Sequence, residues 1–165
     1  MSRIYSIEVK QHIPIDLDTA WNFFSNPNNL LKITPSNFKF KVLSNSGSDK
    51  MYAGQIIEYK VSPLFNIPLY WMTEITQVKE KEFFIDEQKR GPYKLWHHQH
   101  HFKSVVDGVE MIDIVHYQIP LWFLGDVLHY LFLKNKVKEI FDYRIKIIEE
   151  MFGKNENFAA SLVTK

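Results

Sequence analysis

The sequence of 165 residues contains no cysteine. Disulfide bridges, thiolate nucleophiles and sulfur-ligated metal sites are therefore excluded. A chain without disulfides suits a reducing compartment, and the N-terminal segment MSRIYSIEVKQH has no apolar core of the kind that a signal peptide needs. We therefore expect a cytoplasmic protein.

The sequence also lacks an excess of charge and a long hydrophobic run. Its 20 basic and 19 acidic residues give a formal net charge of +1, so no long-range field attracts nucleic acid or an anionic membrane. The most apolar stretch, residues 119–133, is interrupted by Asp126 and His129 and is shorter than the roughly 20 residues of a membrane span. We expect no nucleic-acid partner and no transmembrane segment.

Glycine is scarce, with six residues, whereas aromatic residues make up 15% of the chain. So many large rings must be buried together or must line a cavity. The length suits one hydrophobic core, and we expect a single domain over residues 1–153. Residues 154–165 show no clear pattern and are expected to form a mobile tail.

The hydrophobic pattern predicts an α+β fold. A strand at 4–13 precedes two short helical segments: the first begins at Asp16 as N-cap and ends at Pro27, and the second covers 28–33. A long amphipathic helix then ends at Gly153. Because one helix must cover the sheet, we expect a seven-stranded antiparallel sheet that curves around it and leaves a gap for a small molecule. The six further strands are expected at 38–44, 54–62, 69–78, 82–89, 93–106 and 109–119.

Four segments carry a family resemblance: IPIDLDTAWNFFSNPNNLLKITP, GPYKLWHHQHHF, DIVHYQIPLWFLGD and FDYR. Together they resemble the START-like helix-grip superfamily, specifically its bacterial SRPBCC branch related to polyketide cyclases and dehydratases. The likeness spans residues 1 to about 153. It implies a helix-grip fold with a pocket for a bulky, largely apolar ligand, but it names no substrate because lipid carriers, hormone sensors and cyclases share this scaffold.

The segment WHHQHHF places four histidines on one predicted strand. A two-residue turn at Asp107 and Gly108 would pair Val106 with Val109 and would set the register of the hairpin. Because side chains alternate along a strand, His97 and His101 would then lie on the outer face. The predicted inner face holds Trp96, His98, His100, Phe102, Asp113, Val115 and Tyr117.

Several roles for the inner histidines stay open. They could form a polar network with Asp113 that fixes the register, or they could contact a ligand. Catalysis would use His98 or His100 with Asp113 as a general base and Tyr117 as a proton donor. A metal could be held by His98, His100 and Asp113, but this set is incomplete and enclosed by rings, so we predict no resident metal. No GxSxG or other cofactor or nucleophile motif occurs, and we expect no cofactor.

We expect the chain to bind a small hydrophobic or aromatic ligand between the sheet and the C-terminal helix. A cyclase or dehydratase acting on a polyketide-like substrate is the first alternative. The second is an interaction module that docks through residues 119–133 on a partner or a membrane surface. The sequence leaves the oligomeric state open between monomer and homodimer. Further candidate ligand contacts are Trp71, Asp86, Gln88, Phe141 and Ile145.

Overall fold

A computed structural model describes residues 3–46, 50–62, 67–120, 130 and 133–165. Its main feature is a curved antiparallel sheet of eight strands in the order β2-β3-β4-β5-β6-β7-β1-β8. The predicted α+β class and the curved sheet around a C-terminal helix are confirmed, with one strand more than expected. The strands are β1 (Ile4–Ile13), β2 (Lys41–Asn45), β3 (Gln55–Val61), β4 (Leu69–Lys79), β5 (Phe83–Arg90), β6 (Leu95–Val105), β7 (Gly108–Gln118) and β8 (Ser161–Thr164).

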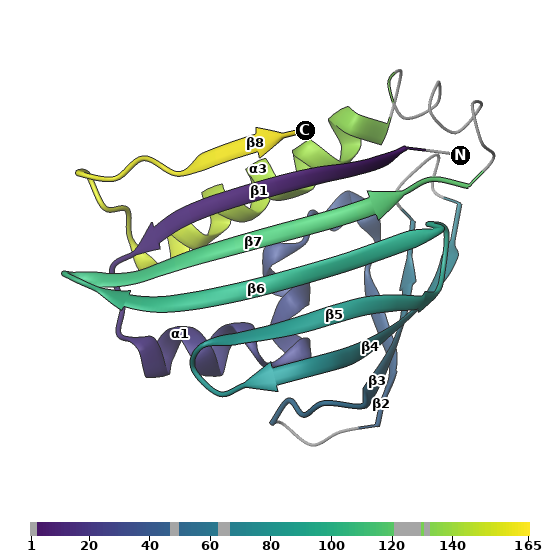
Figure 1. Ribbon diagram of the computed structural model, residues 1–165, viewed down its shortest axis with the longest axis horizontal. Coiled ribbons are helices and arrows are strands. Elements are labelled where there is room, and N and C mark those ends of the chain that lie inside the picture. Colours follow the sequence, from purple (N-terminus) through teal and green to yellow (C-terminus); the bar gives the residue numbers. More distant parts are fainter. Residues whose placement is uncertain (1–2, 47–49, 63–66, 121–129, 131–132) are drawn as a thin grey trace.

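The helices lie on one face of the sheet (Figure 1). They are α1 (Leu17–Phe24), the 3₁₀ segments η1 (Pro27–Ile33) and η2 (Ser36–Phe38), and α3 (Lys134–Phe152). Asp16 caps α1 as predicted, because its Oδ1 accepts the Thr19 N–H at 2.8 Å. At the other end of the chain, the Gly153 N–H donates to the Glu149 carbonyl at 2.9 Å, with a φ of 94° that favours glycine.

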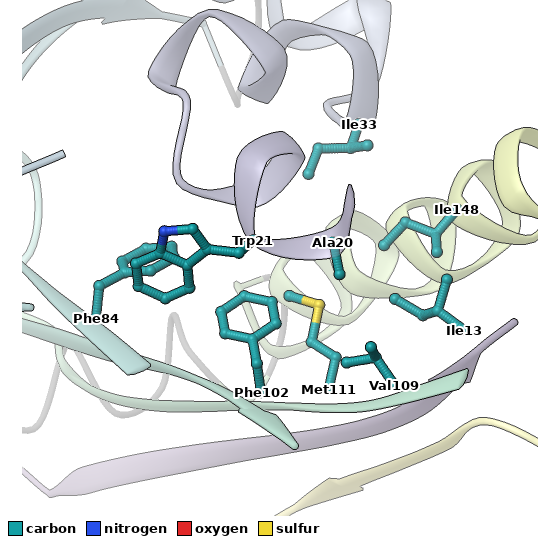
Figure 2. Packing of buried hydrophobic residues seen from close by; sticks show 9 residues of the cluster. All are labelled: Ile13, Ala20, Trp21, Ile33, Phe84, Phe102, Val109, Met111 and Ile148. Atoms are coloured by element: carbon teal, nitrogen blue, oxygen red, sulfur yellow. The ribbon is translucent and has the colours of Figure 1, made fainter. Parts of the chain in front are cut away.

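Buried rings join α1 to the sheet. The Trp21 ring meets Phe102 edge-on, with 5.6 Å between the ring centroids, and meets Phe84 at 6.0 Å. Figure 2 shows these rings on one side of a cluster that Ile13 and Ile148 complete on the other. This packing attaches α1 and the C-terminal half of α3 to β5 and β6. The helices and the sheet are thereby held as the two walls of the candidate site.

The C-terminal residues form an additional strand. β8 pairs with β1, and Leu162 packs against the buried cluster around Phe141. Ser6 and Lys165 exchange backbone hydrogen bonds of 3.0 and 2.9 Å. The sequence analysis, which found no clear pattern at 154–165, therefore missed this strand. A four-residue alternation is too short to be recognised from the sequence alone, without knowledge that the edge of β1 lies beside it.

The turn of the β6–β7 hairpin lies one residue earlier than predicted. Val105 pairs with Gly108, which leaves Val106 and Asp107 as the turn, and Asp107 takes a φ of 63°. Moving a two-residue turn by one position shifts every pair by two residues, so the predicted register is wrong while the predicted faces are retained. His100 consequently lies opposite Asp113, and His98 lies opposite Val115.

Candidate functional site

A cavity of about 200 Å³ lies between the sheet and the helices. Strands β3 to β7 contribute to its wall together with α1, η1 and α3. Most of the wall is apolar or aromatic, which accounts for much of the aromatic content of the chain. The rings that line it are Phe23, Phe24, Phe38, Phe40, Tyr59, Trp71, Phe84, Tyr93, Trp96 and Phe141.

Besides the two tyrosines, four ionisable side chains of the described residues line the cavity: Asp86, His98, His100 and Arg144. Strand pairing brings the first three together, because Asp86 of β5 lies opposite His98 of β6. His98 and His100 point to the same side of β6, since they are two positions apart on the strand, and both are buried. Arg144 reaches the same group from α3, at a position of the helix that faces the core.

The two imidazole rings lie against each other between two carboxylates, with their planes tilted by 40°. Their centroids lie 3.7 Å apart. Oδ2 of Asp86 is 2.9 Å from His100 Nε2 and 3.4 Å from His98 Nδ1. Oδ1 of Asp113 is 3.2 Å from His98 Nε2 and 2.7 Å from His100 Nδ1. The last contact is short but poorly aligned for a hydrogen bond, so we treat it as an ion-pair contact.

Charge is shared unequally between the two histidines. Burial opposes a proton on either ring, but Asp113 and Asp86 raise the pKa of His100 above its ordinary value. Burial lowers the pKa of His98, and the neighbouring His100 lowers it further. The group of four residues is therefore best described with a protonated His100 and a neutral His98.

Both carboxylates stay ionised despite their burial. Burial alone would raise the pKa of Asp113, but the imidazoles of His100 and His98 hold it well below its usual range. The pKa of Asp86 is likewise lowered against burial by His98, His100 and Arg144. With Arg144 and a protonated His100, two positive charges balance two negative ones, which is how a low-dielectric interior tolerates them.

Arg144 is the main site residue that the sequence analysis did not single out. Its Nη1 lies 4.0 Å from Asp113 Oδ2, and its guanidinium lies 5.1 Å from the centre of the Phe141 ring. Its Nε is buried without a hydrogen-bond partner. The sequence contained a signal for it, because Arg144 ends the FDYR segment and occupies a core position in the stripe Val137, Phe141, Ile148.

The structure brings together half of the predicted ligand contacts. Trp71, Asp86, Trp96, His98, His100 and Phe141 line the cavity. The other six predicted contacts do not line it: Phe102, Val115 and Tyr117 belong to the buried core, Ile145 packs beside that core, Asp113 contacts the histidines, and Gln88 bonds to backbone. Tyr117 therefore does not face the space where a substrate would lie, which weakens its suggested role as proton donor.

Gln88 shapes the cavity indirectly. Its Nε2 donates to the Tyr93 carbonyl at 2.6 Å, and its Oε1 accepts the Tyr93 N–H at 3.2 Å. A Cβ at Gly91 would lie 2.3 Å from this Oε1, so a larger residue there would force the Gln88 amide away from its hydrogen bonds with Tyr93. The turn thereby holds the Tyr93 ring 5.6 Å from Trp71 and 4.9 Å from Trp96.

The segment suggested for docking, 119–133, falls mostly on residues 121–129 and 131–132, which lie outside the described part of the chain. Among the described residues, no helix combines the length and the apolar character that crossing a membrane requires.

Comparison with known proteins shows the fold. A protein from Chromobacterium violaceum superposes with a TM-score of 0.68 at 12% identity, covering 91% of this chain and 99% of the other. Ginseng major latex-like protein 151 from Panax ginseng gives 0.65 at 13% identity, with coverage of 91% and 99%. A Thermus thermophilus protein gives 0.64 at 14% identity, with coverage of 88% and 94%.

No family model matches the chain, and no curated protein matches it at the sequence level. At these low identities the structural likenesses support a helix-grip architecture and carry no activity with them.

Proposed function

We propose that this protein binds a small hydrophobic or aromatic molecule in the cavity between the sheet and α3. The observation that carries the proposal is the ring-lined cavity of about 200 Å³. Protein interiors are packed nearly as densely as organic crystals, so a space of this size inside the core is unusual. It is smaller than the ~300–1,000 Å³ of typical ligand pockets, which favours a compact ligand such as a substituted aromatic ring.

The wall supplies both affinity and orientation for such a ligand. Trp71, Tyr93 and Trp96 offer faces and edges for ring contacts, and the buried Arg144 Nε has a hydrogen bond left to donate. A molecule with one polar oxygen and an apolar body would satisfy both parts of the wall. The START-like sequence resemblance points to the same kind of ligand.

Native mass spectrometry of the protein purified from its own host tests the proposal. We expect an organic molecule retained at one per chain and released on denaturation. As a second measurement, a panel of small aromatic compounds should change the fluorescence of Trp71 and Trp96, whose rings lie 5.3 Å apart at the cavity. No retained mass together with no fluorescence change across the panel would contradict the proposal.

A cyclase or dehydratase is the second candidate function, because a carboxylate-paired histidine lines the cavity. His100 lies 2.7 Å from Asp113 and carries a proton in the charge arrangement described above, so it can act as the general acid that a dehydration requires. If His100 only binds, His100→Gln should weaken ligand retention by about 1–3 kcal/mol without changing any reaction rate. If His100 catalyses, the same change should lower turnover of a β-hydroxycarbonyl substrate roughly 100-fold at nearly constant affinity.

A further inference from the structure

Three ligand-type atoms converge at the cavity wall. One atom each from Asp86, His98 and His100 lies within 4.8 Å of the other two. Asp86 Oδ2 is 2.9 Å from His100 Nε2 and 3.4 Å from His98 Nδ1. Two ligands of one metal ion, each ~2.0–2.2 Å from it, lie about 2.9–3.5 Å apart in octahedral or tetrahedral geometry. Both measured distances fall within that span.

The other nitrogen of each ring faces a second carboxylate. Asp113 Oδ1 is 3.2 Å from His98 Nε2 and 2.7 Å from His100 Nδ1. Metal-binding histidines commonly use their second nitrogen in this way, because a carboxylate behind the ring fixes its orientation and makes it a stronger donor. Asp113 does not line the cavity, whereas the other three residues do. The group therefore has a cavity side and a supporting side.

A metal ion bound here would take the place of the proton on His100. Among the described residues, the group has two buried carboxylates, those of Asp86 and Asp113. The guanidinium of Arg144, 4.0 Å from Asp113, is the permanent positive charge beside them. Histidines bind a metal ion only when unprotonated, so a cation between Asp86 and the rings would supply the positive charge that the His100 proton supplies in its absence.

We propose that Asp86, His98 and His100 form a site for one divalent transition-metal ion that faces the cavity. Two imidazoles and one carboxylate, without sulfur, favour ions such as Zn²⁺ or Fe²⁺ over soft ions such as Cu⁺. Three protein ligands leave a coordination position open, and an oxygen atom of a molecule in the cavity can occupy it. The proposal replaces the ligand set suggested by the sequence, in which Asp113 was the third ligand and no resident metal was expected.

Titration calorimetry with Zn²⁺ alone tests the site on the full chain after chelator treatment and without any organic ligand. We expect one ion per chain with a dissociation constant in the micromolar range or below. Asp86→Asn and His98→Gln should each weaken binding at least tenfold. Asp113→Asn should keep the stoichiometry and weaken binding by about 10–100-fold, as for a residue that orients ligands.

The same strand provides matched controls. His97 and His101 occupy the opposite face of β6, so His97→Gln and His101→Gln should leave Zn²⁺ binding unchanged. Binding that persists in His98→Gln, or that is lost in the His97 and His101 variants, would overturn the proposal.

A spectroscopic measurement on the unaltered chain avoids any folding defect of the variants. Co²⁺ in place of Zn²⁺ should give visible absorption bands of a site with nitrogen and oxygen ligands at one equivalent. No saturable absorption and no heat of Zn²⁺ binding would overturn the metal site while leaving the ligand cavity of the proposed function untouched.

Discussion

At the scale of single residues, the buried carboxylates hold the polar part of the cavity wall together. Asp113 contacts both imidazoles and lies near Arg144. Removing one partner of a buried charge network is far more costly than removing an exposed ion pair, because the remaining charges cannot turn to water. The side chain of Asp113 is only 5% exposed, so this reasoning applies to it in full.

We predict that Asp113→Asn lowers the free energy of unfolding of the metal-free protein by about 3 kcal/mol. The amide keeps the shape of the side chain but leaves His100 and Arg144 without their main counter-charge. Chemical denaturation measures the change. The control is Glu87→Gln on the outer face, where Glu87 pairs with His97 at 2.9 Å and the loss should be about 0.5 kcal/mol or less. Equal losses of unfolding free energy in the two variants would show that the buried charge network contributes no more to stability than the exposed ion pair.

Gly108 marks a position where the hairpin approaches another strand closely. Its φ is 150°, and a Cβ there would lie 2.2 Å from the Ile13 carbonyl oxygen. We predict that Gly108→Ala destabilises the protein by about 2–4 kcal/mol, because it adds a clash with fixed backbone to a strained conformation. Gly54→Ala is the comparison: φ is 93° there with no atom within 4 Å, so the loss should be about 1 kcal/mol. Thermal unfolding of both variants checks the order, and the reverse order would refute the argument.

At the scale of elements, the sequence predicted which side chains share a face but not which residues pair. Alternation along β6 is a property of the strand itself, so the burial of His98, His100 and Phe102 follows from their spacing. The pairing of β6 with β7 depends on the turn, where Asp-Gly favoured a later position than the one adopted. Because the error was two residues, the inner face kept its members while each residue changed partner.

Strand β8 is an element that single-strand patterns could not reveal. It depends on β1, whose edge would otherwise expose unpaired backbone groups. We predict that removing residues 154–165 lowers stability by about 1–2 kcal/mol, through the loss of the partly buried Leu162 and of the edge hydrogen bonds. In hydrogen exchange, the Ser6 amide, which donates to Lys165, should lose its protection while the β6–β7 ladder keeps it. An unchanged Ser6 amide would show that β8 does not pair in solution.

At the scale of the whole molecule, the order of elements was enough to predict the fold. The site was predicted only in part, because its wall comes from segments far apart in the chain. Asp86 became a neighbour of His98 through the β5–β6 pairing, and Arg144 arrived from α3 across the core. Neither contact follows from the local pattern of one strand or one helix. The aromatic content indicated that rings would be buried together or would line a cavity, but their positions depended on the curvature of the sheet.

The cavity itself gives the final prediction, since a binding site and a tightly packed core respond differently to a larger side chain. Ile57 lines the cavity, whereas Ile7 lies in the core beside Phe141, and each is 1% exposed. Ile57→Phe should fill empty space, so its unfolding free energy should stay within about 1 kcal/mol of the original or rise. Ile7→Phe should cost about 1–3 kcal/mol, because no space is available for the added atoms.

For ligand binding we expect the opposite order of the two variants: the substitution that leaves stability unchanged should weaken binding, and the one that lowers stability should not. Ile57→Phe should weaken binding of an aromatic probe at least tenfold, as measured by tryptophan fluorescence, because the new ring occupies the volume that the probe needs. Ile7→Phe, where it folds, should retain the affinity. A stable Ile57→Phe variant that still binds the probe at full strength would place the binding site elsewhere, since two rings cannot share a space of about 200 Å³ that the original wall already surrounds closely.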